Sequence, residues 1–458
     1  MEKTAKQSKF NMTEGIEWKL ILSFAIPIIL GNMLQQLYNT VDGIVVGNYV
    51  NSNALAAIGT CSTLARFFLC FSMGFSNGCG VIVSQLYGAR QDSEIRKAFT
   101  TGMIIALGLG VLLSAFGLIC HGWILSSLMN IKDPDVFAYA DTYFVIYCMG
   151  LIFTYIYNFI AYILRAFGDS RATLYFLALT SILNLVLDLL MVRWWGIAGA
   201  AIATVISQLV CAIVSYIYMT RRYDSLNIRF SEYRVDGPMA KKCVTLGIPA
   251  ILQISSVSIG NIIMQRLVNS FGSTVMAGYT VGVKMESYMH APLQGIQQSM
   301  ATFTGQNVGA GKLDRVKRGL YRALLINMIA CAVVALICLI AGDALGRMFG
   351  LEGESLNFAV KMIRFYSYVA PTLFFFGAYF CCAGLIHGSG DVAYATFVSL
   401  FALASRVVYS YVGVYAFSAS EAVLYHSTML SNGLSMVLAW AGYFSGKWKD
   451  KSKKILGR

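Results

Sequence analysis

The sequence predicts an all-α integral membrane protein with twelve transmembrane helices in two six-helix lobes, related by a pseudo-two-fold axis along the membrane normal. Two observations carry this prediction. Hydrophobic residues make up 57% of the chain and charged residues only 12%, a composition that is typical of proteins embedded in lipid. Short motifs also recur at a displacement close to half the chain length, which indicates that one multi-span unit has been duplicated.

Twelve apolar stretches are each about 20 residues or longer, which is enough to cross a hydrocarbon core of about 30 Å as a helix. Their continuous apolar runs exclude a membrane β-barrel, because barrel strands alternate between apolar and polar residues. The predicted spans cover residues 20–46, 54–86, 98–120, 139–163, 172–192, 197–220, 243–269, 276–305, 320–341, 365–386, 394–416 and 421–445.

The duplication is visible in repeated motifs. The sequence Gln85–Ala89 (QLYGA) returns as Gln306–Ala310 (QNVGA), nearly half the chain further on. Two further pairs, Pro27 with Pro249 and Asp169 with Asp391, are separated by the same number of residues. That separation is one residue longer than the separation of the two glutamine motifs. Six spans per copy is an even number, so both copies insert in the same orientation as parallel repeats. Such a chain is typical of a transporter whose two lobes surround a central cavity.

Lysine and arginine are distributed asymmetrically, although the net charge of +13 alone would suit a nucleic-acid-binding protein. Most of them lie on the termini and on the even-numbered links between spans. Those on the odd-numbered links are Lys132, Arg193, Arg347, Lys361 and Arg364. By the positive-inside rule, this pattern predicts a multi-pass protein of the plasma membrane with both termini in the cytoplasm, and no nucleic acid as a partner.

The predicted organisation has five parts. They are a cytoplasmic N-terminus (1–19), a first lobe (20–220), a cytoplasmic linker (221–242), a second lobe (243–445) and a basic cytoplasmic tail (446–458). The tail is expected to lie on anionic lipid headgroups. A two-lobed chain can form its whole cavity alone, so we expect a monomer whose partners are membrane lipids and small organic substrates.

Carboxylates inside the predicted spans are the sharpest chemical signal after the repeat. Only Asp42, Asp188 and Glu286 lie well inside spans. A carboxylate at the centre of a membrane helix costs about 2.5–3.5 kcal/mol on insertion scales, so such residues commonly bind ions, relay protons or face a wet cavity.

Carboxamides accompany two of these acids on the same helix face. Gln35, Asn39 and Asp42 follow an i, i+4, i+7 spacing, and Asn184 and Asp188 follow an i, i+4 spacing. These groups are hard oxygen ligands that suit Na⁺, or an acid pair that exchanges a proton. A hydrogen-bonded polar clamp between helices is the structural alternative.

The duplication provides an internal control for these residues. At the displacement that relates Pro27 to Pro249, the second copy carries Met264, Arg406 and Ser410 in place of Asp42, Asn184 and Asp188. If the acids were needed only to hold the fold, both copies should carry them. We therefore expect ion coupling to reside in the first lobe.

A substrate cavity is expected to use polar and aromatic residues from several spans. Glu286 could attract a cationic substrate or pair with Lys284 or Arg406, and the dense aromatic residues of the fourth and tenth spans could bind flat cations through cation–π contacts. The substrate-cavity candidates are Gln35, Asn39, Tyr143, Met264, Glu286, Phe375 and Tyr379. Pro27 and Pro249 each remove a backbone donor and can bend their helices.

Five motifs in chain order resemble the multidrug and toxic compound extrusion (MATE) transporters, over roughly residues 15–445. They are Ile26-Pro27, Gln85–Ala89, Leu164–Asp169 (LRAFGD), Gly196–Thr204 (GIAGAAIAT) and Gln306–Ala310. The resemblance implies twelve helices in two lobes and export of cationic amphiphiles against entry of H⁺ or Na⁺.

The resemblance also points to a bacterial branch of the family with an aspartate cation site in the first lobe. Asp42, Asn184, Asp188 and Thr204 match the pattern of that site, with Na⁺ as a candidate metal ion there; Thr204 is implicated only by the resemblance. Another branch uses acids in the seventh and tenth spans. Here the seventh span offers only Gln253 and Asn261, and the tenth has no internal acid.

We therefore expect a secondary active antiporter that exports cationic amphiphilic drugs or toxic organic compounds in exchange for H⁺ or Na⁺ by alternating access. The alternative is a lipid-linked oligosaccharide flippase of the same broad superfamily, which would need a basic cavity for phosphates. No cofactor is expected beyond the coupling ion. The sequence lacks an HExxH metal motif and a cluster of histidines, so neither an enzyme nor catalytic residues are expected.

Overall fold

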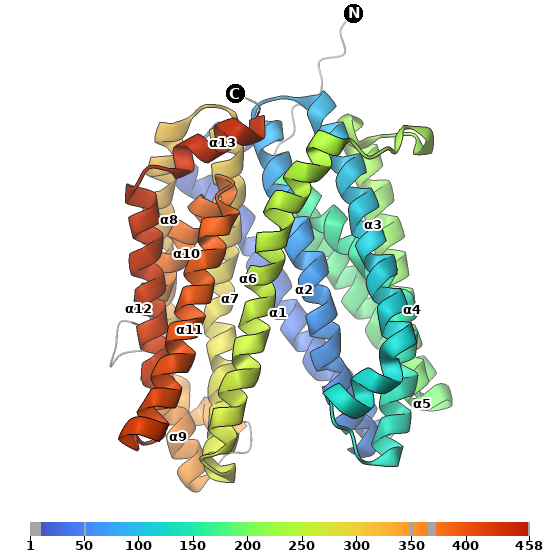
Figure 1. Cartoon of the computed structure of the whole chain (residues 1–458), viewed down its shortest axis with the longest axis vertical. Helices are drawn as coiled ribbons and strands as arrows, with labels where there is room; N and C mark the ends of the chain where they lie inside the picture. The colour runs from blue at the N-terminus through green and yellow to red at the C-terminus, as the bar shows by residue number, and fades with distance from the viewer. Residues whose placement is uncertain (1–10, 50–51, 349–351, 365–371, 457–458) are drawn as a thin grey trace, which may run out of the picture. The chain divides into compact units, whose positions relative to one another are not determined.

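The computed structural model describes residues 11–49, 52–348, 352–364 and 372–456. The side chains of residues 37–49, 52, 55, 56, 230, 345, 348 and 454 lie outside this description. All regular structure in the described residues is helical (Figure 1). The main helices are α1 (Glu17–Tyr49), α2 (Ser52–Gly88), α3 (Asp92–Trp123), α4 (Pro134–Ala166), α5 (Ser170–Arg222), α6 (Gly237–Asn269), α7 (Ser273–Gly309), α8 (Leu313–Met348), α9 (Gly353–Arg364), α10 (Thr372–Gly388), α11 (Val392–Phe417), α12 (Val423–Phe444) and α13 (Trp448–Leu456).

Each predicted span falls on a helix over its described residues, and eight of the described helices are long and apolar enough to cross a membrane. The all-α membrane fold is therefore confirmed. Short helical segments occupy two of the links: a π-helix follows α3 at Ile124–Leu128, and 3₁₀ turns at Asp224–Leu226 and Phe230–Glu232 join α5 to α6.

Helix α5 contains two predicted spans, because the chain reverses within it. Gly196 has φ 55° and ψ −134°, which breaks the helix between residues 172–192 and 197–220. Contacts connect the far ends of the two segments: Cys211 Sγ donates to the Phe176 carbonyl at 3.6 Å, and Tyr218 Oη donates to Asp169 at 2.7 Å. The two segments of α5 are therefore antiparallel neighbours.

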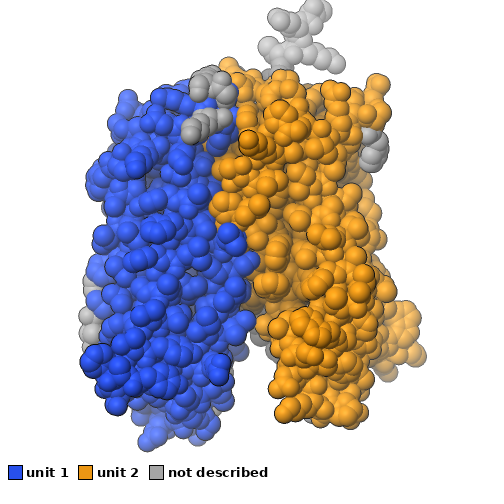
Figure 2. Space-filling view, viewed as in Figure 1, with its two compact units in different colours: residues 1–29, 252–458 blue, residues 30–251 orange. Residues whose placement is uncertain are grey.

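The described chain divides into two compact units, coloured separately in Figure 2. Unit 1 comprises residues 1–29 and 252–458, and unit 2 comprises residues 30–251. Helices α1 and α6 each continue from one unit into the other. Both do so shortly after a proline, Pro27 in α1 and Pro249 in α6. The lobe boundaries expected from sequence stay a prediction.

The core of unit 2 is built around α4, which packs against α2, α3 and α5. Asp133 begins α4 by accepting hydrogen bonds from the backbone of the first turn, with Pro134 at the first helical position. Fully buried Tyr155 donates to the Phe68 carbonyl of α2 at 2.7 Å. Gly150 allows α5 to approach, because a Cβ there would lie 2.3 Å from Val205.

The core of unit 1 is built around α7, which packs against α8, α9 and α10. The α7–α10 contact depends on small residues. A Cβ at Gly384 would lie 2.5 Å from the Gln297 carbonyl, and one at Gly388 would lie 2.2 Å from the Ala301 carbonyl. Close backbone approach at glycine is a common way to pack helices in membranes, where the hydrophobic effect does not drive helices together.

The repeated Gln-x-x-Gly-Ala motif has a structural role in unit 1. Gln306 Oε1 accepts the Met12 backbone N–H at 2.9 Å, and Asn307 Nδ2 donates to the Met12 carbonyl at 3.1 Å. Arg315 extends the contact by donating to the Gly15 carbonyl at 3.0 Å. The segment before α1 is thus fixed to the C-terminal end of α7.

Candidate functional site

Polar groups of α5 form the described part of the predicted ion-coupling site. Asn184 and Asp188 lie one turn apart on the first segment of α5, and each is 1% exposed. Asn184 Nδ2 donates to Thr204 Oγ1 at 3.4 Å, across the turn at Gly196. Thr204 Oγ1 also donates to the Ala200 carbonyl at 3.1 Å. The reversal of α5 therefore brings Asn184 and Thr204 together from its two separate segments.

The remaining part of this predicted site lies on α1. Gln35 is half-buried, whereas the side chains of Asn39 and Asp42 lie outside the described residues. The convergence of Asp42 with Asn184, Asp188 and Thr204 thus stays a prediction. The described side chains offer a carboxylate, an amide and a hydroxyl group as ligands. Their oxygen atoms are hard ligands, which suit Na⁺ or a proton rather than a soft transition metal.

The aromatic and sulfur-containing cavity candidates are mostly buried. Tyr143 is 7% exposed within the core of unit 2, and Met264 is 1% exposed within a cluster of unit 1. Phe375 is half-buried on α10 near Gly433. Tyr379 shares a hydrogen bond with Ser399 of α11 at 3.1 Å. The substrate role of these residues stays a prediction.

Glu286 has a neighbour that the sequence analysis overlooked. His290 Nε2 lies 3.8 Å from Glu286 Oε1, one turn along α7. The histidines do not cluster with one another in the sequence, and none was expected to pair with an acid. The available signal was the i, i+4 spacing of residues 286 and 290 on one helix face.

Other polar groups of unit 1 link α6, α7, α10 and α11. Arg406 donates to Tyr279 Oη at 3.2 Å. Gln253 Nε2 donates to Ser399 Oγ at 3.1 Å, and the same hydroxyl contacts Tyr379. Gln253 is one of the two polar residues, with Asn261, that the seventh span offers in place of the acids of another branch.

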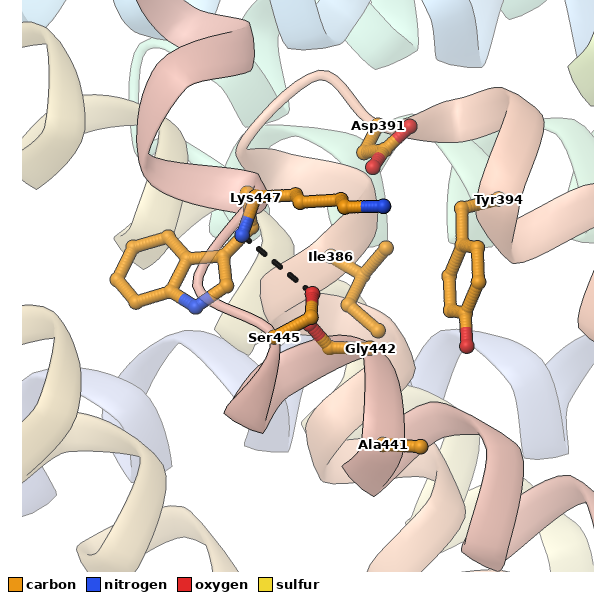
Figure 3. Close-up of a pocket in the computed structure, with 8 residues that line it drawn as sticks. Ile386, Asp391, Tyr394, Ala441, Gly442, Ser445 and Lys447 are labelled. Atoms are coloured by element: carbon orange, nitrogen blue, oxygen red, sulfur yellow. Dashed lines mark hydrogen bonds between the residues drawn. The ribbon is translucent and has the colours of Figure 1, made fainter.

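A pocket of about 210 Å³ lies where α13 packs against α10, α11 and α12 (Figure 3). In Figure 3 the Lys447 side chain extends toward Asp391. Lys451 pairs with Asp391 at 3.1 Å, and Trp448 is 2% exposed with its ring stacked on Tyr443. None of the residues predicted to bind ion or substrate lines this pocket, so it is separate from the candidate site.

Comparisons with known proteins are consistent with the fold and with the duplication. The MatE family model matches residues 27–190 and again residues 249–412. The two matches begin at Pro27 and Pro249, so they are related by the same displacement as the repeated prolines. The chain is 28% identical to "Probable multidrug resistance protein YpnP" of Bacillus subtilis over 387 residues, covering 83% of this chain and 84% of the relative.

Several solved structures share the fold, among them the following two. One is a MOP superfamily transporter from Pyrococcus furiosus, described as having a binding pocket whose reversed polarity suggests a different function. It has a TM-score of 0.88 and 21% identity, and the match covers 99% of each chain. The other is a MATE protein in the bent conformation, with a TM-score of 0.88 and 20% identity over 99% of this chain and 100% of the other. Since the family model covers more than half of the sequence, the chain belongs to the MatE family of membrane transporters.

Proposed function

We propose that this transporter is a secondary active antiporter that exports cationic amphiphilic compounds in exchange for H⁺ or Na⁺ by alternating access. The proposed coupling site consists of Asp42, Asn184, Asp188 and Thr204. The observation that carries the proposal is the buried polar group on α5, where Asp188 lies one turn from an Asn184 that contacts Thr204. The second repeat has Ser410 where the first has Asp188.

Burial explains why this site would bind a cation. An ionised carboxylate inside an apolar helix bundle is unfavourable, so it either takes up a proton or holds a positive ion. The amide and hydroxyl oxygens nearby could complete the coordination of Na⁺, or accept a hydrogen bond from the protonated acid. Both outcomes neutralise Asp188, and release of the ion restores its charge.

Inward movement of one charge supplies enough energy for uphill export. Each elementary charge is worth about 2.3 kcal/mol per 100 mV of membrane potential, which corresponds to about a fifty-fold concentration ratio at equilibrium. Ion entry is proposed to bend α1 near Pro27, with Pro249 as its counterpart in α6. The positions of both prolines, shortly before each helix changes unit, support this role.

The substrate class is inferred from chemistry and from the relative. Glu286 and the aromatic side chains of α10 could bind an organic cation, and the Bacillus relative is named as a probable multidrug resistance protein. We further propose a plasma-membrane location with both termini in the cytoplasm. In support, Met12 and α13 both pack at the C-terminal end of α7 in unit 1 (Figure 1).

Transport by purified protein in liposomes tests this function. Ethidium movement would be recorded under an imposed pH gradient, an imposed Na⁺ gradient, or neither. We expect one gradient to drive ethidium uphill and Asp42→Asn to abolish the driven component. Asp141→Asn serves as the control, because Asp141 also lies in unit 2 but is partly exposed beside His121.

The outcomes distinguish the ion and the mechanism. Loss of driven transport in Asp42→Asn, with Asp141→Asn active, would support coupling at the proposed site and identify the ion from the effective gradient. Driven transport that persists in Asp42→Asn would refute the site. No uphill movement of ethidium or of other organic cations by correctly folded protein under either gradient would refute the antiport.

A further inference from the structure

Unit 1 contains an acid and a base one turn apart on α7. Glu286 and His290 lie near the middle of the predicted span 276–305, and their side chains are 12% and 16% exposed. The 3.8 Å between Glu286 Oε1 and His290 Nε2 is slightly beyond a direct hydrogen bond, so a small side-chain rotation or one water molecule would link them. The two groups are close enough to share a proton.

The surroundings of this pair are largely apolar. From α10, the ring of Phe376 lies 4.3 Å from the His290 ring and that of Phe380 lies 6.4 Å away. From α9, the carbon and sulfur atoms of Phe358 and Met362 face α7 at Gly278 and Gly282, one to two turns before Glu286. A charge on either group is therefore poorly solvated unless the other balances it.

Few ionisable groups face the pair among the described residues. From α11, the positive charge of Arg406 acts on His290, and that arginine also donates to Tyr279 Oη at 3.2 Å. Lys284 lies on α7 itself but is exposed, and Tyr379 is the ionisable residue of the adjacent α10 aromatic cluster. Arg406 therefore adds a permanent positive charge to the surroundings of the pair.

The duplication again separates structure from function. The two repeats can be aligned by the displacement of the glutamine motif or by that of the prolines, which differ by one position. In the first copy, Glu286 then corresponds to Ala65 or Leu64, and His290 corresponds to Leu69 or Phe68. The first copy thus forms the same helix with only apolar residues at these positions. Since the helix forms with apolar side chains at both positions, the fold does not require the Glu286–His290 pair. Burying two ionisable side chains costs free energy, so their presence in the second copy indicates a functional role.

We infer that Glu286 and His290 form a second proton-binding site, in the opposite unit from the Asp42–Asp188 site. One proton is held between Glu286 Oε1 and His290 Nε2 and exchanges with water. When an organic cation contacts the Glu286 carboxylate, that proton leaves to the aqueous phase, so one positive charge replaces another and the net charge is unchanged. This link to substrate rests on the proposed function, whereas proton binding by the pair does not.

Infrared titration tests proton binding without any substrate. The carbonyl stretch of a protonated carboxyl group would be followed as the pH of the purified protein is varied. The other carboxyl groups of the chain titrate as well, so the Glu286 signal is obtained as the difference between the wild-type and Glu286→Gln spectra. We expect this component to be retained in Glu286→Asp, Asp42→Asn and the control Glu354→Gln, an exposed carboxylate of α9. His290→Gln should shift the midpoint of this component by about one pH unit or more, a tenfold change in proton affinity.

Two results would overturn proton sharing. A spectrum that is identical in wild type and Glu286→Gln across the pH range would show that Glu286 does not titrate there. A Glu286 band whose midpoint ignores His290→Gln would show that the two groups do not share a proton. The Glu286→Asp variant guards against misfolding, because it keeps a carboxyl group in the helix.

Proton release on ligand binding tests the link to substrate. Tetraphenylphosphonium, which carries a permanent charge and no titratable proton, would be added to weakly buffered protein. In the Asp42→Asn background we expect proton release to persist, and to disappear when Glu286→Gln is added. Release that survives in the double variant Asp42→Asn with Glu286→Gln, or release that Asp42→Asn alone abolishes, would contradict the second site. Either result leaves the ethidium experiment, and hence the antiport proposal, to be judged separately.

Discussion

Replacement of Gly196 by alanine isolates the backbone strain at the turn within α5. Gly196 has a φ of 55°, and no atom lies within 4 Å of where a Cβ would be. The substitution therefore introduces no steric clash with neighbours. Its effect is the conformational free energy of holding alanine at backbone angles that L-residues rarely adopt. That cost is about 1–3 kcal/mol, a substantial part of the roughly 5–15 kcal/mol by which a typical domain is stable.

A second glycine provides a matched control. Gly122 in α3 also has no atom within 4 Å of a Cβ position, but its φ is helical. Gly122→Ala should be neutral or stabilise the protein by up to about 1 kcal/mol through helix propensity. Thermal and denaturant unfolding of the purified variants would measure both effects. Equal stability of Gly196→Ala and wild type, or an equal loss in Gly122→Ala, would refute the assignment of a strained turn.

Two further predictions concern the segments that flank the helices. Gln306→Ala removes the acceptor of the buried Met12 N–H, so it should lower the free energy of unfolding by about 1–3 kcal/mol. The control is Gln265→Ala, which removes an exposed hydrogen bond. An equal loss of stability in the control would contradict this prediction. Burial and the neighbouring Asp169 carboxylate raise the pKa of Tyr223 above its usual value. Its stabilising effect should be complete below about pH 10 and fade as the pH rises further, so the stability difference between wild type and Tyr223→Phe should shrink in alkali.

The sequence was sufficient to predict the spans because hydrophobic length is a local property. It separated residues 172–192 from 197–220, and Gly196 lies at the reversal between them. It did not predict α9, whose twelve residues are too short and too charged to read as a span. The packing of residues 11–29 with α7 and α8 also has no local signal, because it depends on contacts between segments at opposite ends of the sequence of unit 1.

The site was accessible to sequence analysis only in part. Buried acids stand out in apolar spans, so Asp188 and its neighbour Asn184 were found directly. Thr204 was not, because hydroxyl groups are common in membrane helices and its contact with Asn184 requires the turn of α5. His290 was missed because the histidines were searched only for clusters with other histidines. Its neighbour is an acid, Glu286, one turn away on the same helix.

A comparison between the two repeats tests the central claim, that ion coupling resides at the acids of the first repeat. Asp188→Asn and Ser410→Ala alter corresponding positions, both buried, in the two copies. Uphill ethidium transport would be measured in liposomes for each variant under the gradient that drives the wild type. We expect Asp188→Asn to lose uphill transport and Ser410→Ala to retain it. Uphill transport by Asp188→Asn, or equal loss in both variants, would show that coupling does not depend on the acids of the first repeat.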